Sequence, residues 1–192
     1  MNIDEALILR CQHGEKSAFG ELVKPYLQKA YAISLSFLRS KELAEDTVQN
    51  ALIEAYIGIM EKKDIRSFSG WFLTLVSSRS LDTIRKTGKI TTTETSLDQS
   101  QLELNGATTE PEEHLLKKER NNLLLQMIMA LPDELRIVTI LYYYQDLSLK
   151  EISQLINVPT STIKTRLFRA RVSLGKVIPF QNEFKKVGDS AW

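Results

Sequence analysis

The sequence predicts an all-α fold of two small helical domains joined by a flexible acidic linker, with a helix-turn-helix in the C-terminal domain. Apolar residues recur at spacings of three and four on both sides of a polar stretch that is rich in Thr, Ser, Gln and Glu. No segment alternates with period two for long enough to form a sheet. The predicted organisation is a first domain of residues 1–86, a linker of residues 87–113, a second domain of residues 114–178 and a tail of residues 179–192.

The composition is that of a globular protein without catalytic or metal-binding signatures. Hydrophobic residues make up 43% of the 192 residues and charged residues 26%, enough for an ordinary core. Asp4 and Glu5 stand where a signal peptide would be basic, and no apolar run reaches about 18 residues, so we expect a cytoplasmic chain without a membrane span. A single cysteine, Cys11, excludes an internal disulfide, and His13 and His114 lack partners at metal-ligand spacing. We therefore predict no metal, no cofactor and no enzyme activity.

The first domain is predicted to be helical almost throughout. Residues 41–60 carry an apolar residue every three or four positions and so form a long amphipathic helix. Residues 17–38 show a similar spacing, with Pro25 as a kink or a helix boundary. A polar loop over residues 61–69 then precedes a helix over about residues 70–86.

The second domain is predicted to end in a helix-turn-helix. One helix begins near His114 and ends at Leu131-Pro132, and the next covers about residues 133–144. Residues 148–151 (SLKE) have the S-x-x-E pattern of a capping box, which starts a further helix. The residues that follow this helix are Asn157, which tolerates a left-handed conformation, and Pro159, which opens the next helix.

The last helix is one-sided in charge. It is expected to bury Ile163, Leu167 and Ala170, while residues 160–176 contain five basic residues and no acid. In a helix-turn-helix the second helix enters the major groove of DNA, where its side chains read bases and hold phosphates. The alternative is a solvated helix pair with a positive face.

Charge is also segregated along the whole chain, although the net charge is only +1. Residues 62–89 contain seven basic and two acidic residues, and residues 160–192 contain the same numbers. Residues 90–113, between them, contain six acids and no base. This pattern indicates two contacts with nucleic acid, separated by a segment that avoids or mimics it.

Both predicted domains resemble parts of bacterial sigma factors. The second is similar to sigma region 4 through LPDELR (131–136), DLS (146–148), EI (151–152) and TIKTRLFRAR (162–171). The first is similar to sigma region 2 through AEDTVQNAL (44–52), FSGWF (68–72) and LDTIRK (81–86). Because the segments follow one another in the expected order, the chain resembles the extracytoplasmic-function (ECF) class, group 4 of the sigma-70 family.

This resemblance implies a dissociable subunit of RNA polymerase and not an enzyme. Region 2 would bind core RNA polymerase and read the −10 element, where it traps a flipped base, and region 4 would read the −35 element as duplex DNA. The linker would thread toward the polymerase active site and the RNA exit path. The implied partners are core RNA polymerase, promoter DNA and an anti-sigma factor, often membrane-anchored, while the chain itself is not a membrane protein.

The resemblance also implies which residues make these contacts. For the −35 element they are Ser161, Thr162, Lys164, Thr165, Arg166, Phe168, Arg169 and Arg171. Of these, Lys164, Thr165, Phe168 and Arg169 would face bases, and Arg166 and Arg171 would hold phosphates. For the −10 element they are Lys62, Lys63, Arg66, Phe68, Ser78, Arg79, Arg85 and Lys86. For core polymerase they are Asp46 and Gln49.

Several of these assignments have a structural alternative. Phe68 either stacks on a base or packs in the core, and Trp71 is expected to be a core residue rather than a reader. Asp46 and Gln49 could instead belong to a solvated face. Ser78 departs from the residue that the family usually has on this helix.

Two other classes of protein compete with the sigma interpretation. An autonomous helix-turn-helix regulator would bind a palindromic operator as a dimer and would need a dimerising surface within residues 1–86. A helical interaction protein with incidental basic faces would show no specific dependence on DNA. The region 2-like half and the segregated charge favour a sigma factor.

Overall fold

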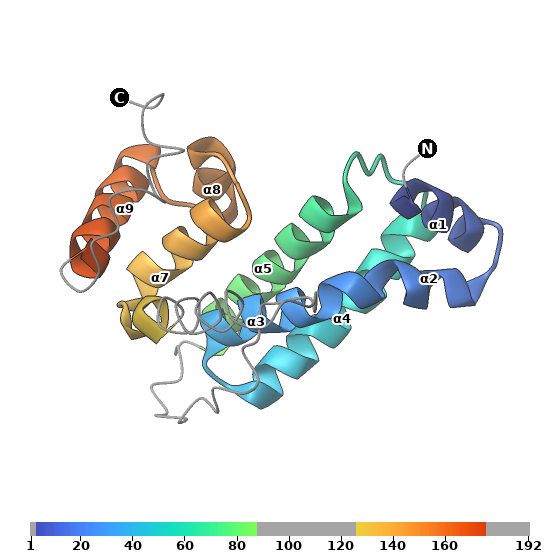
Figure 1. Ribbon diagram of the computed structural model, residues 1–192, viewed down its shortest axis with the longest axis horizontal. Helices are drawn as coiled ribbons and strands as arrows, with labels where there is room; N and C mark the ends of the chain where they lie inside the picture. Colours follow the sequence, from blue (N-terminus) through green and yellow to red (C-terminus); the bar gives the residue numbers. More distant parts are fainter. Residues whose placement is uncertain (1–2, 88–125, 176–192) are drawn as a thin grey trace, which may run out of the picture. The chain divides into compact units, whose positions relative to one another are not determined.

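The computed structural model describes residues 3–87 and 126–175, which fall into two compact units, one within residues 1–110 and one within residues 111–192 (Figure 1). These residues are helical with short turns, and none of them lies in a strand, so the predicted all-α fold is confirmed for them. The predicted linker 87–113, apart from its first residue, and the predicted tail 179–192 lie outside the described residues.

The described part of the first unit, residues 3–87, contains six helical segments. They are α1 (Ile3–Gln12), α2 (Lys16–Val23), the 3-10 turn η1 (Lys24–Tyr26), α3 (Leu27–Leu38), α4 (Lys41–Met60) and α5 (Phe68–Thr87). The predicted break at Pro25 is confirmed, because this proline lies in η1 between α2 and α3. The predicted helix 41–60 is also confirmed, and it begins where the Ser40 hydroxyl accepts a hydrogen bond from the Leu43 amide.

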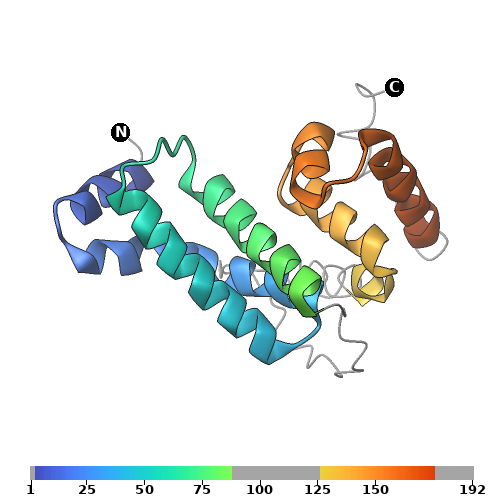
Figure 2. The ribbon, with the colours of Figure 1, turned by 180° about the vertical axis from the view of Figure 1, so that it is seen from behind.

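The core of the first unit lies between α3, α4 and α5, which pack on one another (Figures 1 and 2). Small side chains on α4 are completely buried, among them Ala44, Ala51 and Ala55. They allow the neighbouring helices to approach closely, and the large rings of Phe37 and Phe72 fill the remaining space. α1 and α2 pair with each other and close one end of this bundle.

The helix α5 begins two residues before the predicted start at residue 70. The Ser67 hydroxyl accepts a hydrogen bond from the Gly70 amide at 3.4 Å, and the Ser67 carbonyl accepts one from the Trp71 amide at 3.0 Å. Ser67 therefore acts as the N-cap, and it brings Phe68 into the first turn of the helix.

The second unit contains the helix-turn-helix. Residues 126–130 are helical, and α7 (Asp133–Thr139), the π-helix η3 (Ile140–Tyr144), α8 (Leu149–Ile156) and α9 (Thr160–Gly175) follow. The predicted helix 133–144 has the expected extent, but its last turn is widened: the Gln145 amide donates to the Ile140 carbonyl at 3.2 Å.

Local signals set the ends of α8 as predicted. The Ser148 amide donates to Glu151 at 2.8 Å, and the Glu151 amide donates to the Ser148 hydroxyl at 3.3 Å, which completes the capping box. Asn157 ends the helix in the left-handed conformation, with φ of 56°. The Pro159 carbonyl then accepts the first hydrogen bond of α9, from the Ile163 amide.

One buried charge holds the start of α7 and was not predicted. Arg136 is 0% exposed, its Nη1 donates to the Leu131 carbonyl at 3.0 Å, and its Nη2 pairs with Asp133. The guanidinium thus joins the turn before α7 to the first turn of the helix.

Replacing the hydroxyl of the capping box should weaken the second unit. We expect Ser148→Ala to lower the free energy of unfolding by about 1 kcal/mol, as measured by urea denaturation, because the Glu151 amide loses its acceptor. Hydrogen bonds from Ser148 hold the pKa of Glu151 below its usual value. This carboxylate therefore stabilises the fold at neutral pH, and the effect of Ser148→Ala should shrink below about pH 4 as Glu151 gains a proton.

Ser153→Ala is the matched control, because Ser153 lies inside the same helix and alanine suits that position. An equal loss in both variants would contradict the role of the cap.

Candidate nucleic-acid interface

The helix α9 presents its predicted DNA-contacting face to solvent. Ile163, Leu167 and Ala170 are buried as predicted, and Leu174 extends their stripe. On the opposite side Ser161, Lys164, Thr165, Phe168 and Arg169 are exposed. Phe168 is 57% exposed, although a ring of this size is usually buried. An aromatic ring among hydroxyls and cations can contact the methyl group of a thymine, so this face suits a DNA groove.

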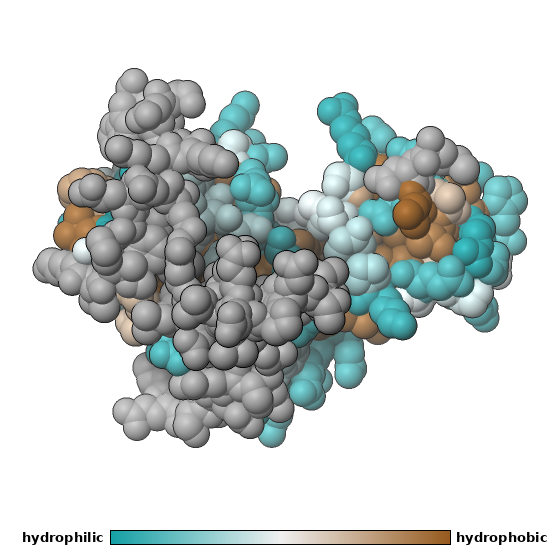
Figure 3. Space-filling view, in the orientation of Figure 1, coloured by the Kyte–Doolittle hydropathy of each residue, from teal (hydrophilic) through white to brown (hydrophobic). Residues whose placement is uncertain are grey.

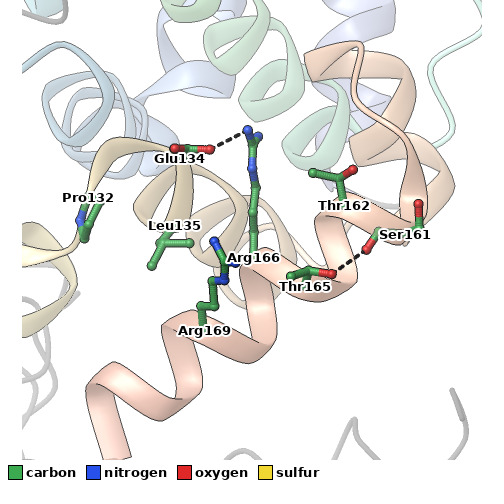
Figure 4. Close-up of a pocket in the computed structure, with 8 residues that line it drawn as sticks. All are labelled: Pro132, Glu134, Leu135, Ser161, Thr162, Thr165, Arg166 and Arg169. Carbon is green, nitrogen blue, oxygen red and sulfur yellow. Dashed lines mark hydrogen bonds and ion pairs between the residues drawn. The ribbon is translucent and has the colours of Figure 1, made fainter.

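A groove lies between the start of α7 and the first turns of α9 (Figure 4). Its volume is about 450 Å³, and its walls are formed by Pro132, Glu134, Leu135, Ser161, Thr162, Thr165, Arg166 and Arg169. Five of the eight predicted −35 residues therefore line one groove. The Thr165 hydroxyl donates to the Ser161 carbonyl at 3.1 Å, one turn earlier in the helix.

The two cations predicted to hold phosphates lie on opposite flanks of α9. Arg166 reaches toward α7 and pairs with Glu134, with 2.5 Å between its Nη2 and the carboxylate oxygen (Figure 4). Arg171 is half-buried on the other flank, and its Nε is buried without a hydrogen-bond partner. Burial raises the pKa of Tyr143, and the positive charge of Arg171 opposes that rise, so these two side chains are neighbours. Neither cation is as freely exposed as the sequence suggested.

In the first unit the predicted −10 loop is an exposed turn between α4 and α5. Lys62, Lys63 and Arg66 are all exposed there. Lys62 adopts a left-handed conformation with φ of 57°, and Lys63 pairs with Glu61 at 3.4 Å. These cations are placed where a nucleic-acid strand could reach them.

Of the two alternatives stated for Phe68, packing in the core is the one that the structure shows, so its inclusion among the −10 contacts is corrected. It is 2% exposed, and its ring lies parallel to the Phe72 ring with 5.6 Å between the centroids. Tyr26 and Trp71 surround it at centroid distances of 5.8 and 6.0 Å. The physical reason is the Ser67 cap, which turns Phe68 into the first turn of α5 and so into the core.

Trp71 joins this aromatic cluster to the loop. It is half-buried, and a Cβ added to Gly58 would lie 3.0 Å from two atoms of its indole ring. The Lys63 amide donates to the Gly58 carbonyl at 3.1 Å. The bare backbone of Gly58 therefore lets Trp71 approach α4 just below the basic loop.

Further along α5, two predicted −10 cations are already paired with carboxylates. Arg79 contacts Glu54 at 3.1 Å and Asp82 at 3.0 Å, and the second oxygen of Asp82 contacts Arg85 at 3.0 Å. Ser78 is half-buried beside them, and Lys86 is exposed at the end of the helix. The pattern of basic residues along α5 does not reveal the partner Glu54, because this residue comes from α4, whereas Asp82 lies on α5 itself.

Asp46 and Gln49, the predicted polymerase contacts, are both exposed on α4. Sequence reasoning missed that Ile53, Ile57 and Met60 are also exposed on this helix. The available signal was their spacing of four and three, out of phase with the buried alanines. Figure 3 shows apolar side chains at the surface where the end of α4 meets α1 and α2.

No group of three potential metal-ligating side chains occurs within residues 3–87 and 126–175. No helix in these two stretches is both long enough and apolar enough to cross a membrane.

A helix-turn-helix with this exposed face defines a DNA-binding protein, and comparison with known proteins specifies the family. Residues 22–90 match the family model for sigma-70 region 2, and residues 121–174 match that for sigma-70 region 4. The chain is 34% identical over 176 residues to the ECF RNA polymerase sigma factor SigW of Bacillus subtilis (strain 168), which covers 88% of this chain and 93% of that protein. It is 28% identical over 182 residues to the ECF RNA polymerase sigma-E factor of Escherichia coli (strain K12), with 92% and 95% covered.

Solved structures share the fold. CnrH, solved in complex with the cytosolic domain of CnrY, matches with a TM-score of 0.54 at 18% identity over 91% of this chain and 96% of that one. The sigma factor RpoE of Bartonella quintana, solved with the anti-sigma factor NepR, matches with a TM-score of 0.53 at 20% identity over 85% and 98%. The chain belongs to the ECF sigma factors, which direct promoter-specific transcription initiation.

Filling the space above Gly58 should destabilise the first unit. We expect Gly58→Ala to lower the free energy of unfolding by about 1 kcal/mol, since the added methyl group overpacks against Trp71. Gly20→Ala is the matched control, because nothing lies within 4 Å of its added Cβ, and it should raise stability by about 0.5–1 kcal/mol. Chemical denaturation measures both values, and equal stabilisation by the two substitutions would show that Trp71 moves aside without cost.

Proposed function

We propose that α9 reads the −35 element of a promoter as duplex DNA, and that the loop 61–67 and α5 contact the −10 element. The observation that carries the first assignment is the exposed face of α9, on which Lys164, Thr165, Phe168 and Arg169 lie together. Hydroxyls and guanidinium groups hydrogen-bond to base edges and phosphates, and the ring supplies an apolar contact.

For the −10 element, the exposed loop cations Lys62, Lys63 and Arg66 would steer the single strand. Arg79, Arg85, Lys86 and Ser78 would follow along α5. A flipped base would have to be held by groups other than the buried Phe68. The polar linker, residues 87–113, would join the two DNA-binding units as a tether.

Core RNA polymerase is the proposed partner of the exposed face of α4. Asp46 and Gln49 are exposed one turn apart, which suits a basic helical partner. An anti-sigma factor is the second proposed partner, since the similar sigma factor RpoE was solved in complex with the anti-sigma factor NepR. We also propose that the chain works in the cytoplasm beside the polymerase and catalyses no reaction of its own.

The test is run-off transcription from fragmented genomic DNA with purified core RNA polymerase, with and without this chain. We expect discrete new start sites that share two upstream motifs at a fixed spacing. An autonomous regulator would instead bind a palindromic site without core polymerase, and the chain would add no start sites. That result would overturn the proposal.

Removing the exposed guanidinium of Arg169 should weaken recognition of the upstream motif. We expect Arg169→Ala to lower the initiation rate at limiting holoenzyme by about 5- to 150-fold, equivalent to about 1–3 kcal/mol for a bidentate contact with a base. Ser173→Ala, on the exposed side of the same helix, is the control and should leave the rate unchanged. A uniform effect on promoters with and without the upstream motif would show that Arg169 holds a phosphate instead.

A further inference from the structure

We propose that Glu134 is an internal competitor for the DNA phosphate at Arg166, so that binding of α9 to DNA exchanges one oxyanion for another. The inference rests on the proposed function of α9. It assigns a role to an acidic residue that lies on an otherwise basic DNA-facing groove.

The geometry of the pair is that of a competitor rather than of a core ion pair. The carboxylate oxygen of Glu134 lies 2.5 Å from Nη2 of Arg166. The Glu134 side chain is 63% exposed, whereas that of Arg166 is only 24% exposed. The carboxylate can therefore turn into water at little cost, while the guanidinium stays in the wall of the groove.

The backbone on either side of the pair is fixed. Glu134 lies in the first turn of α7, where an acid is favoured by the helix dipole and where the buried Arg136 holds the chain. Arg166 lies between the buried residues Ile163 and Leu167 of α9. Exchange of the partner of Arg166 therefore needs only a rotation of side chains.

A phosphate can replace the carboxylate chemically. A guanidinium group binds a carboxylate and a phosphate through the same planar set of N–H donors. The donors of Arg166 that point toward Glu134 cannot bind a carboxylate and a phosphate at the same time. The groove beside the pair is lined by Thr162, Thr165 and Arg169, so a phosphate there would meet a second cation and hydroxyl groups. Among the described residues Arg169 is exposed and makes no ion pair. A seated duplex thus offers Arg166 a better-supported anion than Glu134.

The consequence is a lower affinity for DNA than the cations alone would give. An ion pair at the protein surface, such as this one with its exposed carboxylate, changes an equilibrium constant by up to about fivefold. When DNA displaces Glu134 from Arg166, the freed carboxylate takes up a cation from solution. This uptake offsets one of the cations that the DNA releases, so the ion pair should also lower the salt dependence of DNA binding.

The test measures the affinity of the holoenzyme, formed from the full chain and core RNA polymerase, for a promoter fragment over a range of salt concentrations. We expect Glu134→Gln to bind about two- to fivefold more tightly, with the slope of log K against log salt steeper by about 0.9. Asp146→Asn is the matched control, because it removes one exposed acid from the same unit, away from the groove. It should change neither quantity.

Two further variants separate contact from general repulsion. Glu134→Asp keeps the charge but shortens the side chain by one methylene, so it should also tighten binding if the contact with Arg166 matters. In an Arg166→Gln background, Glu134→Gln should have no effect. Tightening that persists in that background, or no tightening in Glu134→Asp, would overturn the proposal. If instead the wild-type holoenzyme does not prefer the promoter fragment over other DNA, the proposed function itself fails.

Discussion

A guanidinium without access to water fixes the C-terminal unit. Arg136 is completely buried, and a buried charge that loses its partner costs several kcal/mol, about 3–5 in measured cases. Its contacts with the Leu131 carbonyl and with Asp133 therefore hold the start of α7 in one position. That position brings Glu134 and Leu135 to α9, and the groove of the candidate DNA interface forms between them. The surface that is proposed to bind DNA thus depends on Arg136, a buried residue that cannot itself contact DNA.

In both units, arginine side chains of the proposed DNA-binding helices form ion pairs with carboxylates. In the first, Asp82 contacts both Arg79 and Arg85, and in the second, Glu134 contacts Arg166. These guanidinium groups are positioned by carboxylates of their own unit, so part of the positive charge of each basic helix is offset locally. A chain built in this way is expected to bind DNA weakly by itself and to depend on the polymerase, which holds both units on one promoter.

Much of the fold could be predicted because its signals are local. The period of residues 41–60, the capping box at Ser148 and the left-handed Asn157 each act within a few residues of their own position. The predicted start of α5 is wrong by two residues because the hydrogen bond that makes Ser67 the cap is weak, at 3.4 Å. The same cap decides between the two alternatives for Phe68, which packs in the core. The π-helical turn after α7, the buried Arg136 and the partners of Arg79 and Arg166 depend on contacts between segments, which spacing along one sequence does not record.

The most direct measurement of the central claim is cleavage of promoter DNA by a tethered iron chelate in the open complex. The chelate would be attached to a Ser173→Cys variant on α9 or to a Thr87→Cys variant at the end of α5, both in a Cys11→Ala background. The account predicts cuts around the −35 element from the first position and around the −10 element from the second. Cuts at one shared segment from both positions, or none from α5, would contradict the assignment of two promoter elements to two units.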